Sequence, residues 1–199
     1  MTDLANPLDL ILNRRSDARL AAPGPDAEQL DLLLQAATTV PDHNTLRPYR
    51  FVVVPEAGQV RFGDALASAV AAADPDVEPI KLDKARAKAM VAPCRIVLIA
   101  SPQPHKVPEW EQVATAACCG YAIALAAAAL GLGAVWKSAG VMRGGDLDEL
   151  FGLAAGEQIL GWVNVGTRTV DPTGDERRPV DLADLVTVVG ADGRRGYRS

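Results

Sequence analysis

Residues 113–140 read VATAACCGYAIALAAAALGLGAVWKSAG, a run with no charged residue before Lys137. Alanine dominates the run, and alanine is the strongest helix former while contributing little to transfer into lipid. The apolar part is long enough to cross a bilayer, but its small side chains favour a central helix packed closely against other helices or a second subunit. We therefore expect no membrane span, and we expect the glycine-rich exit with Trp136, Lys137 and Ser138 to form a ligand-facing turn.

The overall composition limits what this helix can be buried in. With 199 residues the chain is long enough for a sizeable core, and residues 1–199 are expected to form a single domain. A net charge of -5, a pI of about 5.0 and an aromatic content of 5% argue against a nucleic-acid binder. Three cysteines make no disulfide framework and the N-terminal residues lack a signal-peptide pattern, so a cytoplasmic, reduced protein is expected.

Periodicity and capping signals predict the elements around the central helix. Asn6 and Pro7 begin a first helix, and a second helix begins near Asp26 and must stop before Pro41. The pattern predicts further helices at 60–73, 80–90 and 146–151, and strands at 50–54, 94–100 and 159–165. Helices and strands are thus mixed along one chain.

Residues 168–199 differ in character from the rest of the chain. They are polar and contain prolines, and only Leu182 to Val189 has an ordered pattern. On a free tail, the LVTVV run inside that segment would be an exposed, adhesive strand. We therefore expect the tail to wrap around a partner subunit.

Two polar segments are candidate binding groups. Arg14, Arg15 and Ser16 end the first helix, where adjacent arginines point about 100° apart and can address two groups of one ligand. The alternative is a solvated basic helix end that complements the helix dipole. The loop 39–49 collects polar residues just before a strand, and His43 within it is expected to form hydrogen bonds rather than to bind a metal.

Common catalytic motifs give no competing assignment. The sequence has no P-loop and no persuasive Ser/His/Asp order, and no metal site is expected. Gly131 and Gly133 begin like a dinucleotide fingerprint, but they follow a helix instead of a strand, and Trp136 stands where the third glycine belongs. These glycines are expected to end the helix or to let the backbone approach a flat ligand.

Five segments in one order carry a resemblance to a known family. They are RRS at 14–16, PDH at 41–43, RPYRFVVV at 47–54, HKVPEWEQ at 105–112 and GLGAVWKSAG at 131–140. Together they resemble the nitroreductase family of FMN-dependent oxidoreductases, and among its members the small YdjA-like proteins. The resemblance extends from about Leu8 to Gly166.

The resemblance implies an α+β fold in which helices surround a mainly antiparallel central sheet. It also implies a homodimer with two FMN sites at the subunit interface, and a C-terminal strand exchanged between the subunits. This strand exchange agrees with the expectation for the LVTVV run.

By position, the resemblance also assigns cofactor contacts. A phosphate dianion is bound well by guanidinium groups and a hydroxyl, as the first segment offers. The residues expected to hold the FMN phosphate and part of the flavin are Arg14, Arg15 and Ser16. Those expected to reach the flavin across the dimer interface are Thr39 and His43. Those expected to close the site are Trp136, Lys137 and Ser138, with Lys137 near the phosphate or a ring carbonyl.

The implied reaction needs no catalytic side chain. In a ping-pong sequence, flavin N5 accepts a hydride from NADH or NADPH and then reduces a small flat acceptor such as a nitroaromatic or a quinone. Trp110, Gly131 and Gly133 are expected to wall the pocket shared by nicotinamide and acceptor, although Trp110 can also be read as the hydrophobic staple of the central helix.

Two other functions stay open at this stage. The same scaffold can serve another flavin reaction, such as desaturation of a small metabolite or breakdown of a flavin. It can also serve as a non-catalytic flavin-binding module.

Overall fold

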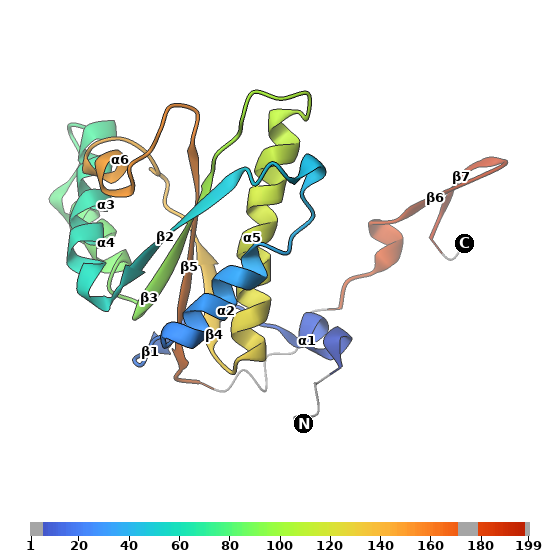
Figure 1. Cartoon of the computed structure of the whole chain (residues 1–199), viewed down its shortest axis with the longest axis horizontal. Helices are drawn as coiled ribbons and strands as arrows, with labels where there is room; N and C mark the ends of the chain where they lie inside the picture. Colours follow the sequence, from blue (N-terminus) through green and yellow to red (C-terminus); the bar gives the residue numbers. More distant parts are fainter. Residues whose placement is uncertain (1–5, 171–178, 198–199) are drawn as a thin grey trace.

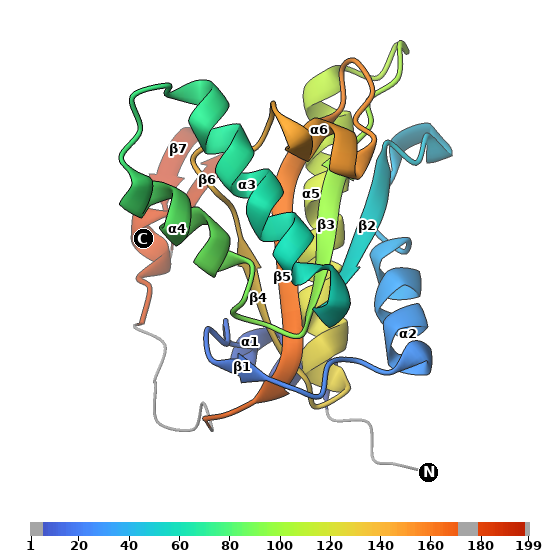
Figure 2. The same cartoon turned by 90° about the vertical axis from the view of Figure 1, so that its left-hand side faces the viewer.

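The computed structural model describes residues 6–170 and 179–197. One central sheet carries helices on both faces (Figures 1 and 2). Its strands follow the order β1 (Leu20–Ala21), β5 (Gln158–Arg168), β3 (Cys94–Ala100) and β2 (Tyr49–Pro55), and β4 (Gly133–Lys137) also pairs with β5. Every pairing is antiparallel. The predicted α+β class with a mainly antiparallel sheet is therefore confirmed.

Helices cover the sheet in two groups, which Figure 2 shows in front of it and behind it. The first group is α3 (Gln59–Ala73), α4 (Pro79–Lys88) and α6 (Asp146–Phe151). The second group is α5 (Glu109–Ala129) and α2 (Ala27–Ala37), with α1 (Pro7–Asn13) against α5. Two hydrophobic cores result, one around Phe62 and Trp162, the other around Leu33, Ile123 and Val163.

Strand β3 shows why the chain needs both cores. Its sequence CRIVLIA is buried at every position, because side chains alternate between the two helix-covered faces. Val97 and Ile99 belong to the α3 core, while Ile96 and Leu98 belong to the α5 core.

Local signals set the beginnings of the first two helices as predicted. The Asn6 side chain accepts a hydrogen bond from the Leu8 amide at 3.1 Å, and Pro7 occupies the first turn. Asp26 and Gln29 form a reciprocal capping box, with Asp26 Oδ1 accepting from the Gln29 amide at 2.8 Å. Both contacts satisfy amides that a helix leaves unpaired.

The prediction for residues 113–140 was wrong about the start of the helix and about the turn after it, whereas the helix does end at the glycines as expected. Helix α5 begins four residues earlier, at Glu109 after Pro108, and it ends at Ala129. Gly131, with φ +76°, reverses the chain, and the Leu132 amide donates to the Ala127 carbonyl at 2.8 Å. Residues 133–137 then form β4 instead of a turn, because five residues of β5 supply their backbone partners.

Helix α5 is a core helix by its contacts. In the part of the chain that the structure describes, it is the one helix long and apolar enough to cross a membrane, judged by length and composition alone. Cys119, Ile123 and Ala127 on its inner side are fully buried against the sheet. This packing agrees with the expected central helix.

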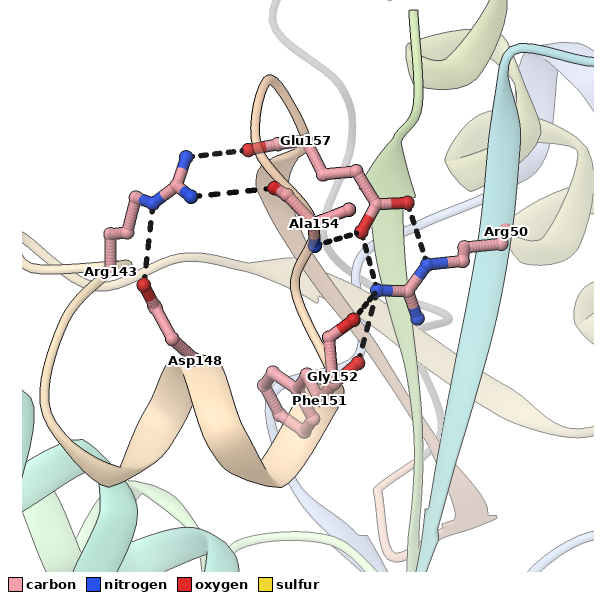
Figure 3. Close-up of polar contacts among 7 residues, drawn as sticks. All are labelled: Arg50, Arg143, Asp148, Phe151, Gly152, Ala154 and Glu157. Atoms are coloured by element: carbon pink, nitrogen blue, oxygen red, sulfur yellow. Dashed lines mark hydrogen bonds and ion pairs between the residues drawn. The ribbon is translucent and has the colours of Figure 1, made fainter.

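Four residues fasten the segment between α6 and β5 (Figure 3). Arg143 donates from Nη1 to the Glu157 carbonyl at 2.8 Å and forms an ion pair with Asp148 at 3.4 Å. The Glu157 carboxylate accepts from the Ala154 amide at 2.9 Å. The start of β5 is thus tied to the helix that precedes it.

The C-terminal segment forms a small sheet of its own. Strands β6 (Thr187–Gly190) and β7 (Gly193–Gly196) pair with each other, apart from the main sheet in Figure 1. Part of the predicted LVTVV strand is therefore present. The predicted exchange with a partner stays a prediction, and residues 171–178 and 198–199 of the predicted tail lie outside the described residues. Arg168, the first residue of that tail, still belongs to β5.

Candidate functional site

Asp17 fastens the loop that follows Arg14, Arg15 and Ser16 to strand β4. The Asp17 amide donates to the Ala134 carbonyl at 3.0 Å, and the Ala134 amide donates back to Asp17 Oδ2 at 3.3 Å. Arg168 Nε lies 3.1 Å from the same oxygen, and the Asp17 side chain is 8% exposed. Two predicted cofactor segments, more than a hundred residues apart in sequence, therefore become neighbours.

Gly133 makes this approach possible. A Cβ atom at this position would lie 2.5 Å from Leu20 Cδ2 and 2.9 Å from Arg168 Cγ. The absence of a side chain thus serves packing within the chain. Gly131 allows the chain to reverse at the end of α5. Neither glycine lines the cavity that lies beside the end of β4.

That cavity has a volume of about 400 Å³ and opens beside the end of β4. Its lining consists of Ala18, Lys88, Val91, Lys137, Ser138, Trp162 and Asn164. The lining contains two lysines and no acidic residue. A site of this composition favours an anionic or acceptor-rich ligand.

Strand alternation separates the three residues predicted to close the site. Lys137 lies opposite Trp162 and Trp136 lies opposite Val163, so the two neighbours face opposite sides of the sheet. Lys137 and Ser138 line the cavity, whereas the Trp136 ring lies against α5, where a Cβ on Gly120 would come within 2.8 Å of it. Trp136 Nε1 donates to the Leu160 carbonyl at 3.2 Å.

The two arginines contact different parts of the chain. The Arg14 guanidinium lies over the Tyr121 ring of α5, 6.0 Å from its centroid. Arg15 Nη1 donates to the carbonyls of Leu12 and Asn13 at the end of α1, at 3.3 and 3.0 Å. Arg15 thus complements a helix C-terminus, as the alternative interpretation expected, and Arg14 stacks on an aromatic ring.

Thr39 lies just after the end of α2, and His43 contacts the first turns of α5, far from Arg14. Thr39 Oγ1 donates to the Ala36 carbonyl at 2.8 Å at the end of α2, and His43 Nδ1 lies 2.8 Å from Glu111 Oε1. Glu111 and Tyr121 are ten residues apart on α5, which corresponds to about 15 Å along the helix. One chain therefore does not bring His43 to Arg14. The expectation that Thr39 and His43 act across an interface stays a prediction.

Trp110 also lies outside the cavity lining. It belongs to the first turn of α5 and is 70% exposed. Its predicted place in a substrate pocket stays a prediction, as do the pocket roles of Gly131 and Gly133 in an assembled site.

The sequence interpretation missed five lining residues: Ala18, Lys88, Val91, Trp162 and Asn164. Among them, Lys88 lies in the helix predicted at 80–90, and Trp162 and Asn164 lie in the strand predicted at 159–165. The available signal was Asn164 itself, a polar side chain inside the apolar segment GWVNVG that is 1% exposed.

The cysteines and acidic residues suggest no metal centre. Within residues 6–170 and 179–197, no group of three or more His, Cys, Asp and Glu side chains could hold a metal ion. Burial raises the pKa of Cys94 to about 11 and that of Cys119 to about 12, so both thiols stay protonated at neutral pH. Cys118 of α5, in contrast, is exposed in the single chain.

Comparison with known proteins agrees with this geometry. The sequence model of the Nitroreductase family matches residues 11–167, which include the Asp17 loop and the cavity lining. YdjA of Escherichia coli (strain K12), a protein named for NAD(P)H nitroreductase activity, is 38% identical over 161 residues, covering 80% of this chain and 87% of YdjA.

Solved structures show the same fold. A nitroreductase-like family protein from Bacillus cereus superposes with a TM-score of 0.78 at 23% identity, covering 95% of this chain and 98% of that one. A nitroreductase with bound FMN from Bacteroides fragilis NCTC 9343 superposes with a TM-score of 0.70 at 16% identity, covering 94% of this chain and 100% of that one. The family match, the identity to YdjA and the shared fold agree with one another, and the chain belongs to the nitroreductase family.

Proposed function

We propose that this chain is an FMN-dependent NAD(P)H oxidoreductase that reduces small flat acceptors, such as nitroaromatics or quinones. One observation carries the proposal. The loop after Arg14, Arg15 and Ser16 is bonded to β4, so that its Ala18 lines the same acid-free cavity as Lys137 and Ser138. The bond between Asp17 and Ala134 thus supports a site shared by the segment proposed to bind the phosphate and the segment proposed to bind the ring.

The residues present fit FMN chemically. Arg14, Arg15 and Ser16 offer guanidinium groups and a hydroxyl to the phosphate dianion. The ammonium groups of Lys88 and Lys137 suit the carbonyl-rich edge of the ring, and no carboxylate of the lining opposes them. When bound, FMN supplies the ability to accept a hydride and pass it on. The side chains of the chain bind and orient the ring and exclude water from it.

We further propose a homodimer with shared sites, and the position of Thr39 and His43 supports it. His43 is about 15 Å along α5 from Arg14, so it is available to the site of another subunit. The surface beside Arg14 is apolar and open, because Leu8, Leu12 and Tyr121 are 61%, 62% and 45% exposed. A second copy that covers this face would bury these side chains.

The relatives support NAD(P)H as the reductant and FMN as the cofactor. YdjA is named for NAD(P)H as reductant, and the Bacteroides fragilis protein holds FMN. In the proposed ping-pong sequence the nicotinamide leaves before the acceptor enters, so one pocket receives both. Location in the cytoplasm stays part of the proposal.

Anaerobic stopped-flow spectroscopy tests the function. The purified protein is expected to be yellow and dimeric, to bleach on mixing with NADH or NADPH, and to regain colour with nitroaromatics or quinones. A purified protein that does not bind added FMN would contradict the assignment of FMN as the cofactor. Bleaching without reoxidation by any acceptor would indicate another flavin reaction, and failure to bleach would indicate a flavin-binding module.

A further inference from the structure

The α3 face of the central sheet contains an arginine that is buried and forms no ion pair within residues 6–170 and 179–197. Arg95 on β3 is 0% exposed, and Nε, Nη1 and Nη2 all lack hydrogen-bond partners among the described residues. Its guanidinium lies over the Phe62 ring, whose centroid is 6.0 Å from Cζ. Burial lowers the pKa of Arg95 to about 10, so the guanidinium still carries its charge at neutral pH. Such a group destabilises a fold unless it acquires a partner.

The sheet register places an acceptor directly opposite this arginine. Arg95 pairs with Asn164 across β3 and β5, so both side chains lie on the same face with Cβ atoms about 5 Å apart. Asn164 Oδ1 is also buried and without a partner in the part of the chain that the structure describes. An unpaired cationic donor and an unpaired acceptor thus occupy neighbouring positions.

Asn164 also reaches the cavity. It lines the cavity together with Lys88, Lys137 and Ser138, whereas Arg95 lies on the neighbouring strand and is not part of the lining. A primary amide has one acceptor end and one donor end. The group that binds one end of the Asn164 amide therefore determines whether Oδ1 or Nδ2 faces the cavity.

We propose that Asn164 contacts the ligand in this cavity and that Arg95 is a positioning residue that fixes its amide. With Oδ1 held by the guanidinium after a small side-chain rotation, Nδ2 faces the cavity as a donor. Nδ2 then binds a ligand edge rich in acceptors, together with the ammonium groups of Lys88 and Lys137 and the hydroxyl of Ser138. This inference rests on the proposed function, in which that edge is the carbonyl edge of the flavin ring.

Three variants separate this role from a structural one. Asn164→Leu removes the amide, Asn164→Asp replaces the donor by a negative charge, and Arg95→Met removes the guanidinium at similar length. The exposed Arg86 of α4, which pairs with Asp64 and Asp83, supplies the matched control Arg86→Met.

Titration of each purified protein with FMN, followed by fluorescence, gives the first readout. Asn164→Leu and Arg95→Met are expected to raise the Kd for FMN by about three- to tenfold, and the double variant by no more than either alone, because both remove one contact. Asn164→Asp is expected to weaken FMN more and to lower its midpoint potential. Kd values within twofold of the parent, or effects that add, would overturn the inference.

Thermal unfolding of the FMN-free proteins gives the second readout. Arg95→Met is expected to keep or raise the melting temperature while weakening FMN, because it removes an uncompensated buried charge. A lower melting temperature together with a lower affinity for FMN would show that Arg95 has a merely structural role.

NMR of the FMN-free protein tests the pair without the cofactor. Arg95→Met is expected to shift the Asn164 side-chain amide signals, and Arg86→Met is expected to leave them in place. Failure of the parent protein to bind FMN would reject the proposed function. Unmoved Asn164 signals, in contrast, would reject the pair whatever the ligand.

Discussion

Arg50 on β2 and Glu157 before β5 form a two-pronged ion pair between residues 107 positions apart (Figure 3). Arg50 Nε donates to Glu157 Oε1 at 2.7 Å, and Nη2 donates to Oε2 at 2.6 Å. Nη2 also donates to the carbonyls of Phe151 and Gly152, both at 3.0 Å. The pair thus joins the edge strand, the end of α6 and the start of β5.

This pair predicts a loss of stability in acid. The hydrogen bonds from Arg50 lower the pKa of Glu157 from 4.5 to about 2 in the folded protein. A carboxyl with a lowered folded pKa stabilises the fold fully above its unfolded pKa, and that stability is lost as pH falls from about 4.5 towards about 2. Chemical denaturation of Glu157→Gln is expected to show about 2–3 kcal/mol less stability at pH 7 and a flatter pH dependence below pH 5.

The exposed Glu149 of α6 supplies the control. Glu149→Gln is expected to keep the stability and the acid dependence of the parent. Equal acid dependence in Glu157→Gln and the parent would contradict the assignment.

Loss of either adjacent arginine is expected to weaken FMN. Arg14→Ala and Arg15→Ala each remove a charge-assisted contact to the phosphate, worth about 1.5–3 kcal/mol or tenfold or more in affinity. Isothermal titration with FMN measures the change, and Arg61→Ala on α3 is the charge-matched control. Because Arg14 also stacks on Tyr121, Tyr121→Leu shows how much of the Arg14 effect comes from lost positioning.

Asp17 is expected to affect both stability and binding. Asp17→Ala leaves the Ala134 amide and Arg168 without their shared partner, which costs about 1–3 kcal/mol in the free energy of unfolding. The loop after Arg14 and Arg15 is then less firmly held, so the Kd for FMN rises as well. Urea denaturation and FMN titration measure the two effects, and an unchanged Kd would show that the loop needs no such tether.

Gly120 is expected to tolerate no larger residue. A Cβ at this position would lie 2.6 Å from Leu98 Cδ1 and 2.8 Å from the Trp136 ring. Gly120→Val is therefore expected to destabilise the protein by about 1–3 kcal/mol through overpacking between α5 and the sheet. Gly140, with no atom within 4 Å of such a Cβ, gives the control Gly140→Ala. Thermal melts compare the two, and equal melting temperatures would argue against the tight contact.

Shared sites predict complementation between two defective chains. One chain carries Arg14→Ala with Arg15→Ala, and the other carries His43→Ala with Thr39→Ala. When the two are unfolded together and refolded, random pairing is expected to restore about a quarter of the sites, because each mixed dimer contains one intact site. Reductase activity measures the recovery. No recovery above the separate variants would place both segments in the site of one subunit.

The sequence by itself determined the parts of the fold that depend on local interactions. Asn6 and Asp26 begin their helices through contacts within three residues, and Cys94–Ala100 is a strand because its apolar residues suit burial on both faces. The order of the five segments, from RRS to GLGAVWKSAG, was sufficient to indicate the family, which the family match confirms.

Only the tertiary structure decided the features that depend on pairing between distant strands. The run 113–140 is divided into α5 and β4 because β5 supplies backbone partners that a local pattern does not contain. The same pairing turns Lys137 towards the cavity and Trp136 towards α5, since neighbouring strand residues face opposite sides. The pairing of β3 with β5 sets Asn164 opposite Arg95, and no spacing in the sequence gives the register that joins them.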